Sequence, residues 1–457
     1  MRSLVHLKSL GLAFGIALLV AAALVLFRPQ ADRLARYKTT LRAQGERLSL
    51  AELEPRFSES AAAYQRQLNE AAGRLVMAPI PPWEIEPMKK TAPGVAQLAW
   101  KQPNPMSGRH RSATWEAFNT QMDEEETTLV EIRALLGNRP AGSAHDLTDP
   151  LNPSHQIDLV RRRRAAQTLT AAVVRELNRG RLDASLTNLH ALINLARAGG
   201  DGGLLVDRMI HVAICSLGLS VTWETLQAPG WDEPRLAALQ SDWEQFELVT
   251  DFARTVERER ALALAVYQTV RTNKTHRSKL LAGGTLWQMA WSEGDELSFL
   301  ETTQLILEGA REAYRKSSYQ ALRAAFAEVR LNPATRDTRL NRFRFQLTRI
   351  ILPNWEKAAL TLMRIETTRQ LAVTAVAIKR HQLKYGAMPE NLAQLVPDFL
   401  RAEPRDFMNG QHLVFRRNAG DEFALYSSGE NGQDDGGRND DIVWPRPERE
   451  LEAATGK

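Results

Sequence analysis

The feature that most limits the fold of this chain is an unbroken apolar stretch close to its N-terminus. Leu10 to Phe27 contains only apolar or small residues, with Lys8 before it and Arg28 directly after it. A helix of this length, rising about 1.5 Å per residue, is roughly 27 Å long and just crosses the hydrocarbon core of a bilayer. The sequence therefore predicts an N-terminal transmembrane helix and a membrane anchor over residues 1–30.

A cleaved signal peptide is the alternative interpretation, because an early position and a basic start suit both. Its apolar core would be long for that class, and no small-x-small cleavage site directly follows Phe27, so we favour a retained anchor. The basic residues close behind the stretch are Arg28, Arg33, Arg36 and Lys38, against two before it. This count favours a cytoplasmic side for the following chain, whereas an exported C-terminal part is the commoner arrangement for such anchors.

The next part of the chain, residues 31–153, is predicted to be a helical stalk followed by a proline-rich connector. Ala31 to Val76 is polar and helix-forming but has too few large apolar residues for a coiled-coil seam. Prolines are dense between residues 79 and 110, and glycine and proline recur from Gly137 to Pro153. Because proline cannot continue a helix, we expect extended or irregular chain in both places.

Residues 154–345 carry the strongest helical pattern and are predicted to form an α-helical scaffold domain. The apolar positions that recur at helical spacing are Leu182, Leu186, Leu189 and Ile193, and before them Leu169, Val173 and Leu177. Glycines end both stripes, at Gly180 and at Gly199, and a third apolar run spans residues 204–226. Helices joined by short glycine-containing turns indicate αα-hairpins.

Charge and motifs offer little that would support catalysis or nucleic-acid binding. Fifty-nine basic residues face 54 acidic ones, a net charge of +5, so no nucleic-acid partner is expected. Neither a Walker A loop nor GxGxxG, GxSxG or HExxH is present, and the nine histidines include no pair at the spacing of a zinc-binding helix. The single cysteine, Cys215, sits in an apolar run and is interpreted as a buried hydrophobe.

Two charge clusters have a structural interpretation beside a functional one. Arg161 to Arg164 could bind phosphate or an acidic partner, but the solvated start of a helix is the favoured interpretation. Glu257 and Glu259 lie among arginines, a pattern that usually indicates surface ion pairs. We therefore predict no catalytic residues and no bound organic cofactor.

The sequence changes character after residue 345. Trp355 to Lys384 is predicted to be one long helix, which the segment from Tyr385 to Pro389 ends. A short helix over Glu390–Leu395 and two strands, at residues 413–415 and 423–426, follow, with a turn at 418–421 between the strands. Ser427 to Ile442 is then a loop dense in Gly, Asp and Asn.

This order resembles the globular domain of the major pseudopilin of type II secretion systems. The residues that carry the resemblance are Tyr385, Gly386, Pro389, Leu392 and Leu395, then Ser427, Gly429, Gly432, Gly436, Gly437 and the ending Asp441-Ile442-Val443-Trp444. The likeness covers roughly the last quarter of the chain. It implies a small α+β domain with a short antiparallel sheet over residues 346–447, followed by a tail over 448–457.

The resemblance also implies that the closing loop binds Ca²⁺. The ligands it implies are Asn431, Asn439, Asp440, Asp441 and the carbonyl groups of Ser427 and Ser428. Calcium takes six to eight oxygen ligands, which such a loop can supply, although the spacing is not that of an EF-hand. Asn431 stands where the family has Asp, which lowers the ligand charge, and a solvated acidic turn without metal is the alternative.

The chain departs from the family at its start, which lacks the family's leader, processing site and Phe-Thr-Leu-Ile-Glu type helix. The terminal module is therefore expected to be reused in a different membrane protein. We predict a mainly α protein of the bacterial inner membrane, with one span and most of the chain in the periplasm. Its expected function is a non-enzymatic interaction or structural module with protein partners in the envelope, in a narrower form as an accessory to a type II secretion or pilus-like assembly. The alternative is an envelope hydrolase or ligand-binding protein with a site in the helical domain.

Overall fold

The computed structural model describes most of the chain beyond residue 29. The described residues are 30–53, 58–75, 90–92, 95–96, 115–140, 155–198, 204–226, 228–246, 248–352, 355–417 and 423–443. The predicted transmembrane helix at Leu10–Phe27 and the predicted turn at 418–421 lie outside these residues and stay predictions. Within them, the protein is mainly helical with a small antiparallel sheet near the C-terminus, as the sequence predicts.

The chain folds into two compact units, each assembled from segments far apart in the sequence. The first unit combines the described residues up to Leu53 with Val256–Gly309 and Ala324–Trp355. The second combines Glu54–Thr255, Ala310–Arg323 and the residues from Glu356 onward. The predicted domains, in contrast, are continuous ranges of sequence.

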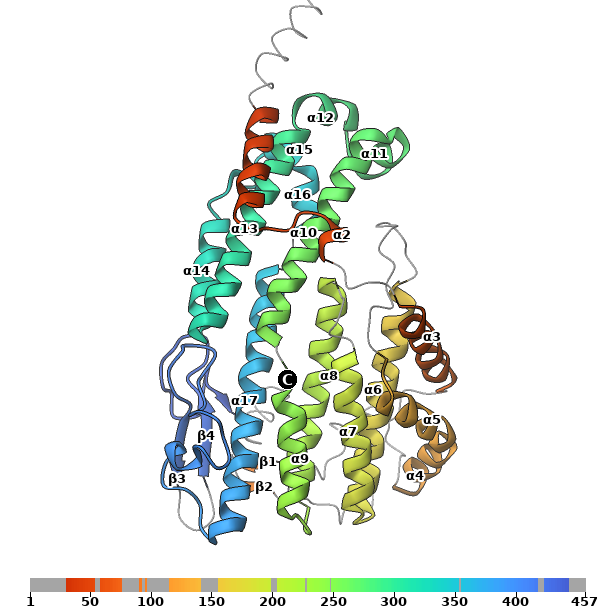
Figure 1. Cartoon of the computed structure of the whole chain (residues 1–457), viewed down its shortest axis with the longest axis vertical. Coiled ribbons are helices and arrows are strands. Elements are labelled where there is room, and N and C mark those ends of the chain that lie inside the picture. The colour runs from red at the N-terminus through yellow and green to blue at the C-terminus, as the bar shows by residue number, and fades with distance from the viewer. Residues whose placement is uncertain are drawn as a thin grey trace, which may run out of the picture. The chain divides into compact units, whose positions relative to one another are not determined.

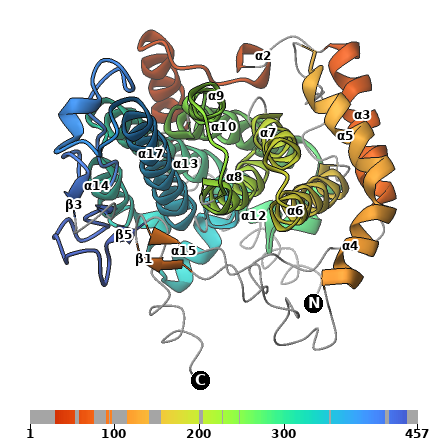
Figure 2. The same ribbon diagram turned by 90° about the horizontal axis from the view of Figure 1, so that it is seen from below.

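Helices make up most of the second unit (Figure 1). Those that precede residue 248 are α3 (Glu59–Arg74), α4 (Trp115–Glu124), α5 (Glu126–Gly137), α6 (His155–Asn178), α7 (Leu182–Ala198), α8 (Leu205–Leu226) and α9 (Glu233–Glu244). Helices α6, α7 and α8 pack against one another and lie side by side in Figures 1 and 2. The predicted apolar stripe is their core, because Leu186, Leu189 and Ile193 are all buried. A short hairpin of β1 (Lys90–Ala92) and β2 (Val95–Ala96) lies in the predicted connector.

Helix α8 is the one helix of the described residues that has the length and apolar composition of a membrane span. Half of the most apolar 18-residue segment of this helix is buried inside the protein, as expected for a core helix. Cys215 lies on this helix and is buried, which confirms its interpretation as a core residue. Burial also raises the pKa of the Cys215 thiol, so the thiolate is disfavoured.

The arginine cluster of α6 is only in part the solvated helix start that the sequence suggests, because Arg163 is exposed whereas Arg162 is not. Arg162 is buried and donates a hydrogen bond to Gln65 on α3. Arg164 donates to the carbonyl oxygen of Leu75 at 2.9 Å, just beyond the end of α3. Arg162 is held inside the second unit and Arg164 is half-buried, because α3, distant in sequence, supplies their acceptors.

The C-terminal part of the second unit confirms the predicted helix and strands. Helix α17 (Trp355–Tyr385) ends where Gly386 adopts a left-handed conformation with φ +72°. The predicted short helix is a single 3₁₀ turn, η5 (Leu392–Leu395). Strands β3 (Val414–Arg417), β4 (Phe423–Ser427) and β5 (Ile442–Val443) form an antiparallel sheet in the order β3-β4-β5.

The first unit contains a helix over residues 30–43 and the elements between residues 248 and 352. These are α2 (Leu50–Leu53), α10 (Leu248–Thr272), α11 (Lys274–Leu280), α12 (Gly284–Ala290), α13 (Ser292–Lys316), α14 (Tyr319–Val329), η4 (Pro333–Thr335), α15 (Arg339–Arg344) and α16 (Gln346–Ile351). Helices α10, α13 and α14 also contribute residues to the second unit.

The predicted stalk over residues 31–76 is wrong as a single solvated helix. The helix over 30–43 ends before Gly45, which has φ +84°. Leu41 and Leu48 then pack with Leu300 of α13 in a buried cluster. The chain folds back because these leucines find an apolar partner on α13, which is too distant in sequence for local periodicity to reveal.

The charged run in α10 is also wrong as a set of surface ion pairs. Glu257 is buried and its carboxylate accepts a hydrogen bond from Arg47 at 2.7 Å. Arg260 is fully buried and donates to Glu46 at 2.8 Å and to Gln304 at 2.6 Å. Buried ions are stable only with such partners, so this run is part of the interior of the first unit.

Candidate functional site

The predicted calcium ligands lie at the end of β4 and in the loop that follows it. The side chains of Ser427 and Ser428 donate to Asp406 at 2.8 and 3.3 Å, while the ligands implied at these two residues are their carbonyl groups, which stay a prediction. The backbone of Asn431 donates to the carboxylate of Asp440 at 2.8 Å, so the structure brings these two residues together. Asn439 has φ +50°, a strained conformation that turns the chain ahead of Asp440.

Asp441 is the predicted ligand with spare capacity. Its Oδ2 accepts from the backbone of Gly437 at 2.7 Å, while its Oδ1 is buried without a hydrogen-bond partner. Burial raises the pKa of this carboxyl. The described residues include no group of three or more His, Cys, Asp or Glu that could hold a metal ion.

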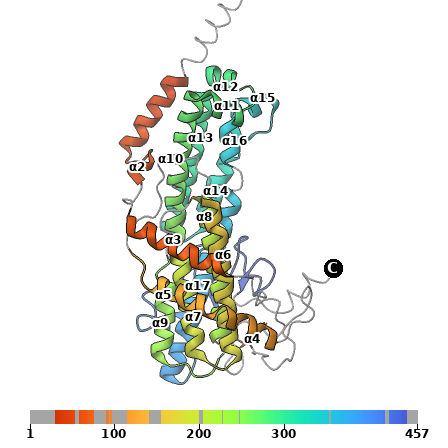
Figure 3. The same cartoon turned by 90° about the vertical axis from the view of Figure 1, so that its right-hand side faces the viewer.

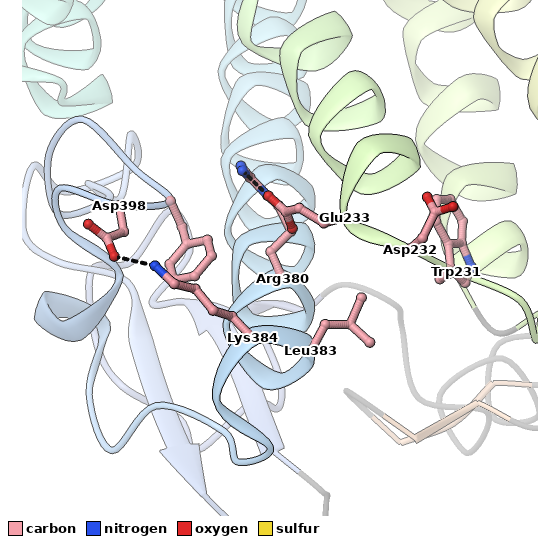
Figure 4. A pocket seen from close by; sticks show the side chains of 8 residues that line it. Trp231, Asp232, Glu233, Arg380, Leu383, Lys384 and Asp398 are labelled. Carbon is pink, nitrogen blue, oxygen red and sulfur yellow. Dashed lines mark hydrogen bonds and ion pairs between the residues drawn. The ribbon is translucent and has the colours of Figure 1, made fainter.

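A groove in the second unit carries both apolar and charged side chains. It has a volume of about 670 Å³. Its lining comes from the start of α9, the end of α17 and the segment after η5, and consists of Trp231, Asp232, Glu233, Arg380, Leu383, Lys384, Asp398 and Phe399 (Figure 4). Leu383 lies between the Lys384–Asp398 pair and Trp231 in this view.

Local sequence explains how each wall of this groove is placed. Asp232 caps α9 by accepting from the backbone of Arg235 at 2.9 Å, which orients the first turn and Glu233. Arg380 and Lys384 are four residues apart on α17 and therefore share one face of that helix. Phe399 stacks edge-on against Tyr385, which ties the segment after η5 to the end of α17.

The ionised groups of the groove are paired with one another. Arg380 donates to Glu233 at 2.9 Å and to Gln240 at 2.9 Å. Lys384 donates to Asp398 at 2.8 Å, an interaction that raises the pKa of the lysine and lowers that of the carboxyl. Both groups are therefore charged at neutral pH, and neither is poised to transfer a proton.

The aromatic residues of the groove are in contact with cations. The guanidinium of Arg380 and the ammonium of Lys384 each lie 5.4 Å from the centre of the Phe399 ring. Lys379, one turn before Leu383, lies 5.7 Å from the centre of the Trp231 ring and donates to the carbonyl of Leu226. Burial lowers the pKa of Lys379 to about 8. The groove thus offers apolar surface bordered by fixed charges.

One acid–base pair of the second unit lies outside the groove. His190 on α7 and Asp242 on α9 are hydrogen-bonded through Nδ1 of the histidine, and both are half-buried. Within the described part of the chain, no hydroxyl or thiol is bonded to the other ring nitrogen of His190. His211 is buried, and burial lowers its pKa to about 3, so it is neutral under ordinary conditions.

Sequence patterns do not reveal this groove. The capping signal Asp232-Glu233-Pro234 predicts the start of a helix, and the spacing of Arg380 and Lys384 predicts a shared helix face. Neither pattern indicates that the two helices meet, or that Asp398 lies within reach of Lys384. A search of protein-family models, of curated proteins and of solved structures finds no significant match to this chain. The fold and the groove therefore define the class only as a mainly helical protein with a terminal α+β module.

Proposed function

We propose that this chain is a membrane-anchored protein of the bacterial envelope that acts as a non-enzymatic interaction module. In this proposal the groove at the end of α17 receives a segment of a partner protein. The observation that carries it is the pairing of every lining carboxylate with a cation around an apolar floor. Apolar contact framed by fixed polar groups is the usual chemistry of a recognition site.

The paired charges also argue for a protein segment over a small ion. An anion or cation would have to displace a partner that already satisfies Arg380 or Lys384. A chain segment with an apolar side chain can instead cover Leu383, which is exposed, and leave the ion pairs intact at the rim. Side chains that fill a desolvated pocket in this way, aromatic ones above all, contribute most of the binding energy at many protein interfaces.

The narrower proposal, an accessory role in a type II secretion or pilus-like assembly, depends on the terminal module. The long helix, the three-stranded antiparallel sheet and the glycine-rich loop are in the order that the resemblance implies. We further propose that Ca²⁺ binds this loop at Asp440 and Asp441, supported by the unpartnered Oδ1 of Asp441. Calcium at 100 times its dissociation constant would add about 2.7 kcal/mol to the stability of the module.

The interaction proposal is tested by photo-crosslinking of the full-length protein in its native host. A photoreactive phenylalanine analogue replaces Leu383 in the groove, and Val206 on α8, which is also exposed, is the matched control position. We expect one envelope protein to be crosslinked at position 383 and not at 206, and the product to be lost when Trp231→Ala alters the groove. Identical products at both positions would refute docking at the groove. Recovery of secretion or pilus components would support the accessory role.

The alternative, an envelope hydrolase, is favoured by the half-buried His190–Asp242 pair, whereas the His412–Glu403 pair is more exposed and provides a control. A fluorophosphonate probe, which labels serine nucleophiles activated by histidine, tests it directly. Labelling that is lost in His190→Ala and kept in His412→Ala, an exposed histidine, would support the alternative.

A further inference from the structure

One end of the first unit carries a surface that its helices do not cover. This end, here called the tip, consists of α11, α12, α15 and α16, which lie together in Figures 1 and 3. The side chain of Gln346 on α16 joins them by accepting from the backbone of Ala282 at 2.9 Å and donating to its carbonyl at 2.9 Å. Leu281, Trp287 and Leu347 form a buried core beneath them. The tip is therefore an ordered part of the unit.

Large apolar side chains project from the tip into solvent. Leu286 and Met289 are 54% and 66% exposed, and they lie three residues apart on one face of α12. Leu340 and Phe343, 56% and 50% exposed, have the same spacing on α15. Leu280 and Ile350 add to this surface. Single exposed apolar residues are ordinary, but such a gathering on one end of a fold indicates contact with a membrane or a partner.

The same helices carry cations and no acidic residue. Residues 274–290 and 339–351 contain neither Asp nor Glu, and their basic residues are Lys274, Arg277, Lys279, Arg339, Arg342, Arg344 and Arg349. Arg342 and Arg349 are paired with Asp337, in the loop before α15. Lys274, Lys279 and Arg339 are exposed, and among the described residues no carboxylate forms an ion pair with them. Apolar side chains interleaved with such cations suit an anionic lipid surface.

The start of the described chain lies beside the tip. A Cβ atom at Gly294, in the first turn of α13 and four residues after the end of α12, would collide with the side-chain amide of Gln30. Lys38, further along the same helix, is paired with Glu296 on α13, which fixes this helix along the first unit. Only two residues separate Gln30 from Phe27, the last residue of the predicted anchor. A bilayer that holds that anchor is therefore within a few residues of the tip.

We propose that the tip is a second membrane contact, which rests on the surface of an anionic phospholipid bilayer. Leu286, Met289, Leu340 and Phe343 enter the boundary between headgroups and acyl chains. Lys274, Lys279 and Arg339 lie at the headgroup phosphates. This inference rests on the proposed anchor for the position of the bilayer, and on the exposed side chains of the tip for the contact itself. Its consequence is that the first unit has a fixed orientation on the membrane.

The test uses the full-length protein in vesicles of phosphatidylethanolamine and phosphatidylglycerol. Cys215 is buried and does not compete for labelling, so Met289→Cys and Phe343→Cys can each carry a polarity-sensitive fluorophore. Val206→Cys on α8 is the matched exposed control. We expect a blue-shifted emission and quenching by lipid-borne quenchers at 289 and 343, and neither change at 206. A label at Leu18 reports the anchor separately.

Charge variants complete the test. The double variant Lys274→Gln/Lys279→Gln changes exposed residues only, so folding is preserved. Each lost cation should weaken the apparent affinity for the vesicles, measured from the quenching at position 289, by about fivefold. Emission at 289 and 343 that matches 206, while Leu18 is quenched, would overturn the tip contact and leave the anchor intact. Equal quenching in neutral phosphatidylcholine vesicles would overturn the anionic preference. A blue shift that needs no lipid and rises with protein concentration would mean self-association instead.

Discussion

Removing the carboxylate of Asp295 should destabilise the tip. Asp295 is fully buried on α13 and accepts five hydrogen bonds. Trp287 Nε1 donates at 2.8 Å, Tyr267 at 3.0 Å, the Thr348 hydroxyl at 2.6 Å, and the backbone amides of Leu347 and Thr348 at 3.0 and 3.2 Å. Those two amides belong to the first turn of α16, whose own N-cap residue, Phe345, provides no side-chain cap. Asp295 thus caps a helix that is distant in sequence.

The magnitude follows from the donors that Asp295→Ala would leave without an acceptor. Loss of a helix cap costs about 0.5–2 kcal/mol. A buried donor without a partner, here the indole of Trp287, costs about 1–3 kcal/mol. Tyr267 retains the Thr348 hydroxyl at 3.0 Å, so it adds little. The expected loss is about 1.5–5 kcal/mol, a large share of the roughly 5–15 kcal/mol that stabilises a typical protein.

Hydrogen exchange measured by mass spectrometry is the suitable assay, because a protein of two units need not unfold in one step. The amides of Leu347 and Thr348 are themselves the reporters, and their protection should fall by about tenfold or more. Glu328→Ala, which removes an exposed carboxylate on α14 of the same unit, is the control and should leave these amides protected. Unchanged exchange at residues 346–351 in Asp295→Ala would refute the assignment of Asp295 as their cap.

Three further changes test the interior of the two units. Lys379→Met should stabilise the protein at pH 7 by up to about 3 kcal/mol, less about 1 kcal/mol for the lost hydrogen bond to Leu226, because burial lowers the pKa of Lys379 to about 8. The unfolded lysine keeps its proton up to about pH 10.5, so the stability of the wild type should rise between pH 8 and 10.5. The extra stability of Lys379→Met over the wild type should therefore shrink across this range, as measured by denaturation curves. Arg260→Met removes a partner of buried Glu46 and should cost about 3–5 kcal/mol in chemical denaturation, with much of the loss recovered by adding Glu46→Gln. Gly429→Ala places a Cβ on the carbonyl oxygen of Asp440 at φ +66°, so exchange should accelerate across residues 427–441, whereas Gly432→Ala, where no atom is close, should disturb the loop less.

Local pattern was sufficient for the helices whose apolar stripe is regular and whose ends carry a glycine. Helix α7 contains the predicted stripe, and α17 begins at the predicted Trp355 and extends one residue past the predicted Lys384. Both outcomes follow from chemistry within one turn of the chain, where side-chain spacing and a left-handed glycine decide where a helix continues or ends. The strands β3 and β4 were equally accessible, since each contains part of a short apolar run of the length typical of a strand.

The sequence by itself also determined which residues are charged, but not which of those charges are buried. Arg162, Glu257 and Arg260 were expected at the surface and lie inside, because each finds a partner from a distant segment; Arg260 bonds to Glu46 across 214 residues. The groove, the Asp295 cap and the tip have the same origin. Whether an ion is stable in the interior depends on the partners that pack against it, and whether an apolar face stays exposed depends on the segments that cover it. Only the tertiary structure decides which segments these are.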